Sequence, residues 1–343
     1  MKRCFLAIAA ITAAMAVFAG PAGACGGLVG ENGTIQLLRT STLAAYHDGV
    51  ERYVTSFEFV GEGAEVGSII PLPDVPSSVE RGGDWTLQRL AREVAPPRRE
   101  GLALQDGIPT SAAAAKVILE TKIDALDITI LEGGAQAVGE WALAHKFFLT
   151  PDAPEVLEFY AARSQIFMAA RFDASRAKAL GQRSGDGTPI MLTIPTDQPW
   201  VPLRILSLGL PKTQRVDADV FLLTDEKPHL LSGGTGLELR RSETANASLL
   251  DDLRSDKGMQ WMPQSMWFTY LQVGTNAGTL DYDLAVSTDA KVAPARVDTG
   301  IARPVAVDPD GLARWPIVLG FVTAAGAIFL LAAWTAGARR RTA

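Results

Sequence analysis

Residues 315–338 form an uncharged, mostly apolar run near the C-terminus, and this run constrains the fold more than any other part of the chain. As a helix, its 24 residues would rise about 1.5 Å each and extend about 36 Å, enough to cross the roughly 30 Å hydrocarbon layer of a bilayer. Trp315 and Trp334 lie near its two ends, where aromatic rings favour the membrane interface. We predict a transmembrane helix here, because a soluble core helix of this length would carry a polar stripe.

The first 24 residues have the composition of a secretory signal peptide. Lys2 and Arg3 precede an apolar stretch too short to span a bilayer comfortably, and a small-residue A-x-A cleavage site follows at residues 22–24. The tail after the C-terminal run, residues 339–343, begins with three arginines, which favours a cytoplasmic location. The predicted product is a single-pass protein of the cell membrane, with its N-terminal domain outside the cytoplasm and its C-terminus inside.

Between the two ends the chain is strongly acidic. The formal net charge is −6, but residues 25–314 carry 27 Lys and Arg against 38 Asp and Glu once the five terminal cations are set aside. Such a body repels phosphate backbones, so we expect no nucleic-acid partner. With 48% apolar and 20% charged residues, the chain is too apolar to be disordered.

Prolines mark the predicted boundaries within the part of the chain that we expect outside the membrane. We predict that residues 25–288 form a β-rich α+β domain with several short helices. Residues 289–314 carry spaced prolines without any period and are interpreted as a stalk. A proline-rich break after residue 95 also leaves open two halves, 25–95 and 110–288.

The periodicity of apolar residues and the positions of turn residues predict the individual helices and strands. His47-Asp48-Gly49 is interpreted as a hairpin turn, followed by a half-exposed strand over 53–59. A further helix is predicted over 135–145. The predicted helix caps are Asp84, Asn246, and Asp152 with Glu155 in a capping box. Strands are predicted at 34–45, 50–60, 66–72, 117–119, 128–131, 165–172, 190–194, 203–208, 218–223, 237–240, 266–273 and 280–286.

Two segments resemble each other. Residues 53–76 and 166–199 each contain an aromatic-ended strand, a turn, and an apolar strand closed by spaced prolines. A diverged duplication and a chance convergence of two hairpins both explain so loose a pattern.

The three histidines are isolated in sequence. His47 lies in a turn, His145 near a helix end and His229 beside Pro228, and none has a ligand-like spacing to a second His or Cys. We interpret them as solvent-facing or capping residues. No G-x-S-x-G motif marks a nucleophile, although a Ser–His–Asp site can be assembled from distant residues.

The remaining candidates have simpler interpretations. Cys25 would become the new N-terminus after cleavage, which fits processing or anchoring better than catalysis, although Ala22 stands where an acylation motif usually has Leu. The glycine-rich run 233–236 lacks the lysine of a phosphate-binding loop and is interpreted as a turn.

Two pairs of aspartates are each spaced by two residues, Asp217 with Asp219 and Asp281 with Asp283. Such pairs share a strand face and could bind a hard cation, but we interpret them as the water-facing side of a strand. A dense aromatic and methionine cluster is interpreted as core rather than as a partner surface. Its members are Trp261, Met262, Met266, Trp267 and Phe268. We therefore predict no catalytic, cofactor-binding or metal-binding residue.

Several stretches resemble the bacterial domain of unknown function 2330 family. They are Ala24–Gly27, Ile69–Pro73, Leu126–Leu149, Val156–Phe172 and Pro189–Leu206. The resemblance implies an exported protein, often with a C-terminal membrane segment. It implies no activity and no site residues.

The preferred interpretation of function is a non-enzymatic binding or envelope-associated protein, with the membrane and an envelope protein as partners. The alternative is an extracytoplasmic enzyme of the hydrolase type, whose site would be assembled from residues distant in sequence.

Overall fold

The computed structural model describes residues 27–30, 40–57, 66–95, 117–182, 188–197, 199–230 and 234–287. All of them belong to the first of two units, Met1–Arg303; the second unit is Pro304–Ala343. The predicted signal peptide, Cys25, the stalk, the transmembrane run and the tail lie outside the described residues. Within the described part of the chain, no helix is both long and apolar enough to cross a membrane.

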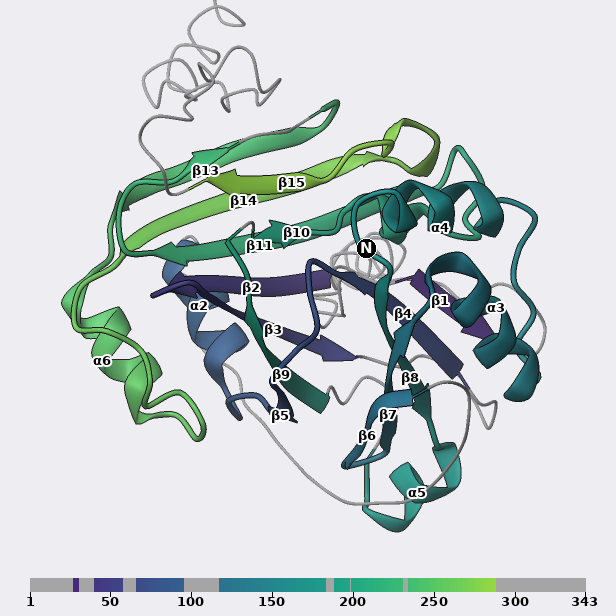
Figure 1. Cartoon of the computed structure of the whole chain (residues 1–343). Coiled ribbons are helices and arrows are strands. Elements are labelled where there is room, and N and C mark those ends of the chain that lie inside the picture. Colours follow the sequence, from purple (N-terminus) through teal and green to yellow (C-terminus); the bar gives the residue numbers. More distant parts are fainter. Residues whose placement is uncertain are drawn as a thin grey trace, which may run out of the picture. The chain divides into compact units, whose positions relative to one another are not determined.

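A seven-stranded sheet forms the larger layer (Figure 1). Its order is β13-β14-β11-β2-β3-β9-β5, and its neighbours are antiparallel except for the parallel pair β11 and β2. The strands are β2 Thr40–His47, β3 Val50–Phe57, β5 Ser78–Arg81, β9 Thr188–Pro195, β11 Arg215–Thr224, β13 Leu237–Thr244 and β14 Trp267–Asn276.

A five-stranded antiparallel sheet in the order β1-β4-β8-β7-β6 forms the second layer. Its strands are β1 Gly27–Gly30, β4 Val66–Leu72, β6 Val117–Ile123, β7 Leu126–Glu132 and β8 Ile166–Phe172. A small sheet has the order β10-β15-β12, with β10 Trp200–Val201, β12 His229–Leu230 and β15 Leu284–Ser287. Strands from both sides of the proline-rich break pair in both large sheets, so neither side has a large sheet of its own.

Three apolar clusters show how these layers are stacked. One cluster joins the facing sides of the two large sheets and includes Tyr53 and Ile128. A second lies between the five-stranded sheet and helices α3 and α4, and a third lies between the seven-stranded sheet and helices α2 and α6. The helices are α2 Thr86–Val94, α3 Gly134–Ala144, α4 Ala153–Ala161, α5 Ala174–Ala179 and α6 Ala247–Ser255, with 3₁₀ helices η1 Arg204–Ser207 and η2 Ala277–Thr279. The predicted β-rich α+β class with short helices is confirmed.

The β2–β3 hairpin confirms the predicted turn. Asp48 and Gly49 have φ angles of 51° and 74°, as a two-residue type I′ turn requires. The half-exposed alternation predicted for the second strand is wrong, because both faces of β3 are covered. Tyr53 lies in the cluster between the sheets, and Val54 lies in the cluster beneath α2 and α6.

Helix α6 begins where its predicted cap places it, and α2 does not. Asn246 accepts a hydrogen bond from the backbone N–H of Ser248 at 3.0 Å. The N-terminus of α2 is capped by Asp256, whose carboxylate accepts from the backbone N–H groups of Asp84 and Trp85, both at 3.0 Å. The cap of α2 therefore comes from a residue about 170 positions away in sequence, where no local pattern could indicate it.

The capping box predicted for α4 is also wrong. The side chain of Asp152 makes no capping hydrogen bond to the helix; it accepts from the backbone N–H of Gly209 at 3.0 Å. Glu155 forms an ion pair with Arg204. Both carboxylates thus bind residues in and just after η1.

Residues 203–208, predicted as a strand, contain the 3₁₀ helix η1. Asp283 accepts from the backbone N–H groups of Leu203 and Arg204 at 2.8 and 3.0 Å, and the Tyr160 hydroxyl accepts from Ile205 at 2.8 Å. Because distant side chains bind these N–H groups, the segment has no need of a strand partner.

The two similar segments pair crosswise. Strand β3 of the first pairs with β9 of the second in the seven-stranded sheet, and β4 of the first pairs with β8 of the second in the five-stranded sheet. Each segment crosses from one sheet to the other, in opposite directions. The similarity therefore marks two of the connections that join the sheets.

Candidate functional site

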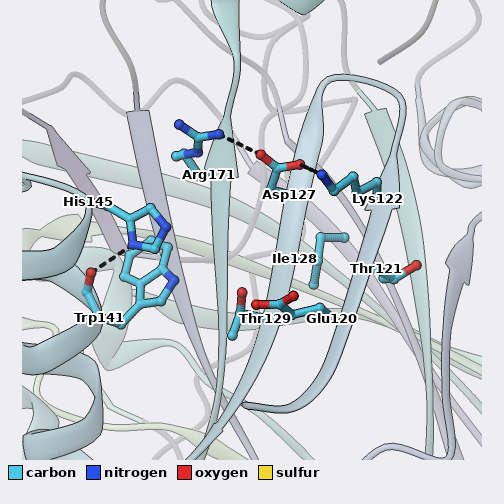
Figure 2. A pocket seen from close by; sticks show the side chains of 9 residues that line it. All are labelled: Glu120, Thr121, Lys122, Asp127, Ile128, Thr129, Trp141, His145 and Arg171. Atoms are coloured by element: carbon cyan, nitrogen blue, oxygen red, sulfur yellow. Dashed lines mark hydrogen bonds and ion pairs between the residues drawn. The ribbon is translucent and has the colours of Figure 1, made fainter. Parts of the chain in front are cut away.

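Helices cover only part of the outer face of the five-stranded sheet. On β7, Leu131 lies in the cluster beneath α3 and α4, whereas Asp127 and Thr129, on the same face of the strand, line a small depression beside α3 (Figure 2). The volume open to the centre of a water-sized sphere in this depression is about 20 Å³. This is room for one water molecule or one functional group of a ligand. The lining residues are Glu120, Thr121, Lys122, Asp127, Ile128, Thr129, Trp141, His145 and Arg171.

Strand register places alternating charges side by side at one end of this depression. Lys122 on β6 lies opposite Asp127 on β7, which in turn lies opposite Arg171 on β8. Residues directly opposite in an antiparallel pair have neighbouring side chains, so the three form a cation–anion–cation row across the sheet. Figure 2 shows this row at the upper side of the depression.

Asp127 is the centre of an ion-pair network. The residue is 8% exposed, and it accepts from Arg171 Nη2 at 2.7 Å and from both terminal nitrogens of Arg176 at 2.8 Å. Arg176 is buried and comes from α5. Lys122 Nζ lies 3.9 Å from Asp127 Oδ1, within Coulomb range but beyond hydrogen-bonding distance. Two arginines therefore occupy the carboxylate, while the ammonium group of Lys122 keeps donors for a ligand.

Helix α3 supplies an aromatic wall. Trp141 is 1% exposed, and its indole Nε1–H has no hydrogen-bond acceptor among the described residues. Its ring lies against His145, with centroids 4.7 Å apart, and Figure 2 shows the indole nitrogen on the side that faces the depression. The indole N–H is a donor only, so an acceptor in the depression would satisfy it.

The last helical turn sets the tautomer of His145. Its Nδ1 lies 2.8 Å from the carbonyl oxygen of Trp141. Because a carbonyl oxygen only accepts, Nδ1 carries the proton, and Nε2 of the neutral ring is an acceptor. His145 is also the C-cap residue of α3, which is one of the two roles, solvent-facing or capping, predicted for the histidines.

The other two histidines lie on different elements. His47 has Nδ1 2.6 Å from Asp225 Oδ1 and Nε2 3.3 Å from Asp48 Oδ2. These groups offer ligand atoms within 4.8 Å of one another, but the two carboxylates are exposed and contact different ring nitrogens, and exposed acidic groups are common without a metal ion. His229 lies on β12, opposite Ser287 on β15.

Neither aspartate pair converges on a cation site. Asp217 pairs with Arg215, whereas Asp219 is buried and accepts from the Tyr270 hydroxyl at 2.6 Å. Asp281 is exposed, as predicted. The predicted water-facing role is wrong for Asp219, and also for Asp283, which is 1% exposed.

The aromatic and methionine cluster belongs largely to the core. Met262, Met266 and Phe268 are buried beneath α2 and α6, as predicted. Trp261 and Trp267 are partly exposed. In the glycine-rich run, residue 233 lies outside the described residues, and Gly236 has a φ of +82° in the turn before β13, consistent with the predicted turn.

Sequence reasoning missed the depression itself. The two-residue spacing of Asp127 and Thr129 places both side chains on one face of the strand, and this spacing can be read from the sequence. The neighbours Lys122 and Arg171 become visible only once β6, β7 and β8 are known to be adjacent.

Two stacked sheets flanked by helices, with a small polar depression on one outer face, define an α+β domain. The family described as uncharacterised protein conserved in bacteria, domain of unknown function 2330, matches residues 19–227. Because this match spans more than half of the chain, the protein belongs to that family, and the resemblance inferred from the motifs is confirmed.

Comparisons with other proteins add little. No curated protein matches the sequence. A chain of the caspase-8/P35 complex covers 74% of this chain and 98% of its own length, with 9% identity and a TM-score of 0.39. The crystal structure of baculovirus P35 covers 72% of this chain and 96% of its own length, with 11% identity and a TM-score of 0.37. At these TM-scores the likeness supports no conclusion about fold or function.

Proposed function

We propose that this protein is a membrane-anchored, extracytoplasmic binding protein, and that one polar group of its ligand enters the depression beside α3. The observation that carries the proposal is the buried indole N–H of Trp141, which faces the depression without an acceptor among the described residues. A buried donor left unpaired costs roughly 1–3 kcal/mol. A ligand acceptor at this position would recover that cost.

The lining favours binding over catalysis. The nine lining residues include neither Ser nor Cys. Asp127 is held by two arginines, and His145 Nδ1 is held by a backbone carbonyl. A hydrolase needs a nucleophile within hydrogen-bonding reach of a base. The lining hydroxyls are those of Thr121 and Thr129, and among the described residues no hydrogen bond joins either of them to His145 or Asp127.

The proposed location rests on the two ends of the sequence. We infer export by the signal at residues 1–24 and anchoring by one helix over residues 315–338, with the stalk 289–314 between domain and membrane. An envelope protein is the proposed partner. Protease added to intact spheroplasts should degrade nearly all of the chain. Full protection of the chain would contradict this topology.

Binding can be tested with the full-length chain in detergent micelles, labelled with 5-fluorotryptophan. The probes are N-acetylglycine, N-acetylglycinamide and glycinamide, which are similar in size and carry negative, zero and positive charge. At least one probe should shift the fluorine resonance of Trp141 in a saturable way. The resonance is assigned with Trp141→Phe.

Trp267 provides the internal control, because its Nε1–H already donates to Ser242 Oγ at 3.0 Å. Its resonance should stay in place during the same titrations. If no probe moves the Trp141 resonance, or if all tryptophan resonances move together, the depression is not the binding site.

A further inference from the structure

We propose that the C-terminal end of α3 inserts into the surface of the lipid bilayer that anchors the chain. The inference rests on the membrane anchoring proposed above and adds the face of the domain that touches lipid. Three observations carry it: two exposed apolar side chains, an exposed lysine between them in sequence, and the length of chain that leads to the predicted membrane helix.

The apolar side chains lie at one end of α3, which covers the outer side of the five-stranded sheet (Figure 1). Leu143 is 78% exposed and Phe148 is 67% exposed, whereas every other large apolar side chain among the described residues is at most 40% exposed. Single exposed apolar residues are common on soluble proteins. These two are different, because they are five positions apart around the end of one helix. We call residues 143–148 the α3 tip.

The turn that closes α3 fixes the shape of the tip. The backbone N–H of Phe147 donates to the carbonyl of Ala142 at 2.8 Å, and that of Lys146 donates to the carbonyl of Leu143 at 3.1 Å. These are the two hydrogen bonds of a Schellman motif. Lys146 has a φ of 60°, at the position where glycine is usual. Phe147 is buried and Phe148 after it is exposed, so the motif holds one aromatic ring in the core and leaves the next outside.

The charge on this side of the domain suits phosphate headgroups. Residues 141–150 contain no Asp or Glu, and Lys146 is exposed. Glu140, one turn earlier, accepts from Gln136 Nε2 at 2.8 Å, toward the N-terminal end of the helix. The lining of the neighbouring depression balances two cations with two carboxylates. The α3 tip therefore carries a local positive charge on a chain whose net charge is −6, and a lysine can cover apolar surface with its stem while its ammonium binds headgroups.

The size of the tip favours a bilayer over a protein partner. A stable protein interface buries about 800 Å² on each partner, far more than two side chains and a lysine supply. Insertion into a bilayer surface scales with the apolar area buried and with the attraction of cations to lipid. A small area is sufficient when the domain is already held at the membrane, because a tether raises its effective concentration there.

The proposed anchor provides this tether. Residues 288–314, 27 in all, separate the last described residue from the predicted membrane helix. Fully extended, they would reach up to about 90 Å. A domain of this length has a radius of gyration of about 18 Å, so the tether allows any face of the domain to reach the bilayer. The exposed side chains then decide which face does.

Depth-dependent quenching with the full-length chain tests the contact. The chain, with Cys4→Ser and Cys25→Ser, is reconstituted in vesicles of phosphatidylethanolamine and phosphatidylglycerol. An NBD fluorophore is attached at Ala144→Cys, an exposed position in the tip that leaves both apolar residues in place. Lipid carrying a nitroxide near the headgroup should quench this label at least about twofold, and aqueous iodide should quench it weakly. A label at Val75→Cys, in the loop between β4 and β5, is the control and should show the reverse.

Two variants show which side chains make the contact. Leu143→Ser combined with Phe148→Ser removes the apolar area and should lower the lipid quenching at position 144 to the level of the control. Lys146→Gly suits the left-handed turn better than lysine does, so it does not weaken the fold. Loss of the ammonium should still reduce the lipid quenching by about twofold. A thermal melt of each variant shows whether the fold is kept.

The outcomes separate this inference from the anchoring on which it rests. If the unlabelled chain does not float with the vesicles in a density gradient, the anchor and the inference fail together. If the chain floats but iodide rather than lipid nitroxide quenches the label at position 144, the tip contact alone is overturned. Protection of this label from both quenchers would mean that protein covers the tip, which also overturns insertion into lipid.

Discussion

The Tyr160 hydroxyl donates a 2.8 Å hydrogen bond to Asp283 Oδ1 and links α4 to the segment before β15. Arg163 Nη1 donates to the other carboxylate oxygen at 2.8 Å, and two backbone N–H groups at the start of η1 complete the set. Burial raises the pKa of Asp283 above its ordinary value, and these four donors act against that rise. One buried carboxylate thus fixes a helix, a 3₁₀ helix and a strand.

We expect Asp283→Ala to cost about 3–5 kcal/mol of the free energy of unfolding, because it removes a buried charge from several donors at once. Tyr160→Phe should cost about 1–2 kcal/mol, since it removes one hydroxyl that both donates and accepts. Urea denaturation followed by tryptophan fluorescence measures both. The control is Asp281→Ala, an exposed neighbour that should cost less than about 0.5 kcal/mol. Equal losses at positions 281 and 283 would refute this assignment.

Asp256 offers a sharp test of capping from a distance. Its carboxylate accepts from two backbone N–H groups and from the Thr86 hydroxyl at the start of α2. Asp256→Ala should cost about 1–3 kcal/mol and speed amide exchange in α2. Asp84→Ala changes the residue that the sequence suggests as the cap, and it should have little effect because, among the described residues, the Asp84 side chain pairs with Arg81 alone. A larger loss of stability for Asp84→Ala than for Asp256→Ala would instead support Asp84 as the cap of α2.

Local sequence patterns predicted an element correctly where residues close to one another in sequence stabilise it. Asp48-Gly49 fixes the hairpin turn, because two adjacent residues adopt positive φ. Asn246 caps α6 through a contact only two residues away. Strand β4 matches its predicted bounds, Val66–Leu72.

Local patterns failed where the deciding partner is distant. The start of α2 is set by Asp256, and the 3₁₀ helix η1 is set by Tyr160 and Asp283. The alternation of β3 suggested an exposed face, but helices α2 and α6 cover it. The depression was missed for the same reason. It is formed by three neighbouring strands, and their order in the sheet cannot be read from the sequence.

Breaking the Asp127 network on one side should cost several kcal/mol, because it leaves a buried charge without its partner. Arg176 is buried and binds Asp127 with both terminal nitrogens at 2.8 Å. Arg176→Met should cost about 3–5 kcal/mol, because Asp127 keeps its charge and loses two of its hydrogen bonds. Adding Asp127→Asn should recover part of the loss, which a double-mutant cycle measures. Strict additivity of the two changes would mean that the residues are not coupled.

Glu51 should make stability depend on pH. Its side chain is fully buried in β3, and neither carboxyl oxygen has a hydrogen-bond partner of ordinary geometry among the described residues. Burial raises the pKa of Glu51 from 4.5 to about 8, with the backbone N–H of Trp200 acting weakly in the opposite direction. At neutral pH the folded protein therefore keeps this proton, whereas the unfolded chain releases it.

The sign of the effect follows from this difference. Between pH 4.5 and about 8 the folded state binds more protons than the unfolded state, so the free energy of unfolding falls as pH rises through this window. The gap between the two pKa values corresponds to about 5 kcal/mol at its upper limit. Glu51→Gln stays neutral and should remove this component. The two proteins should have similar stability near pH 4, and the variant should be several kcal/mol more stable near pH 9. Urea denaturation of both proteins across this range gives the difference directly, and parallel curves would show that Glu51 does not carry a proton in the folded state.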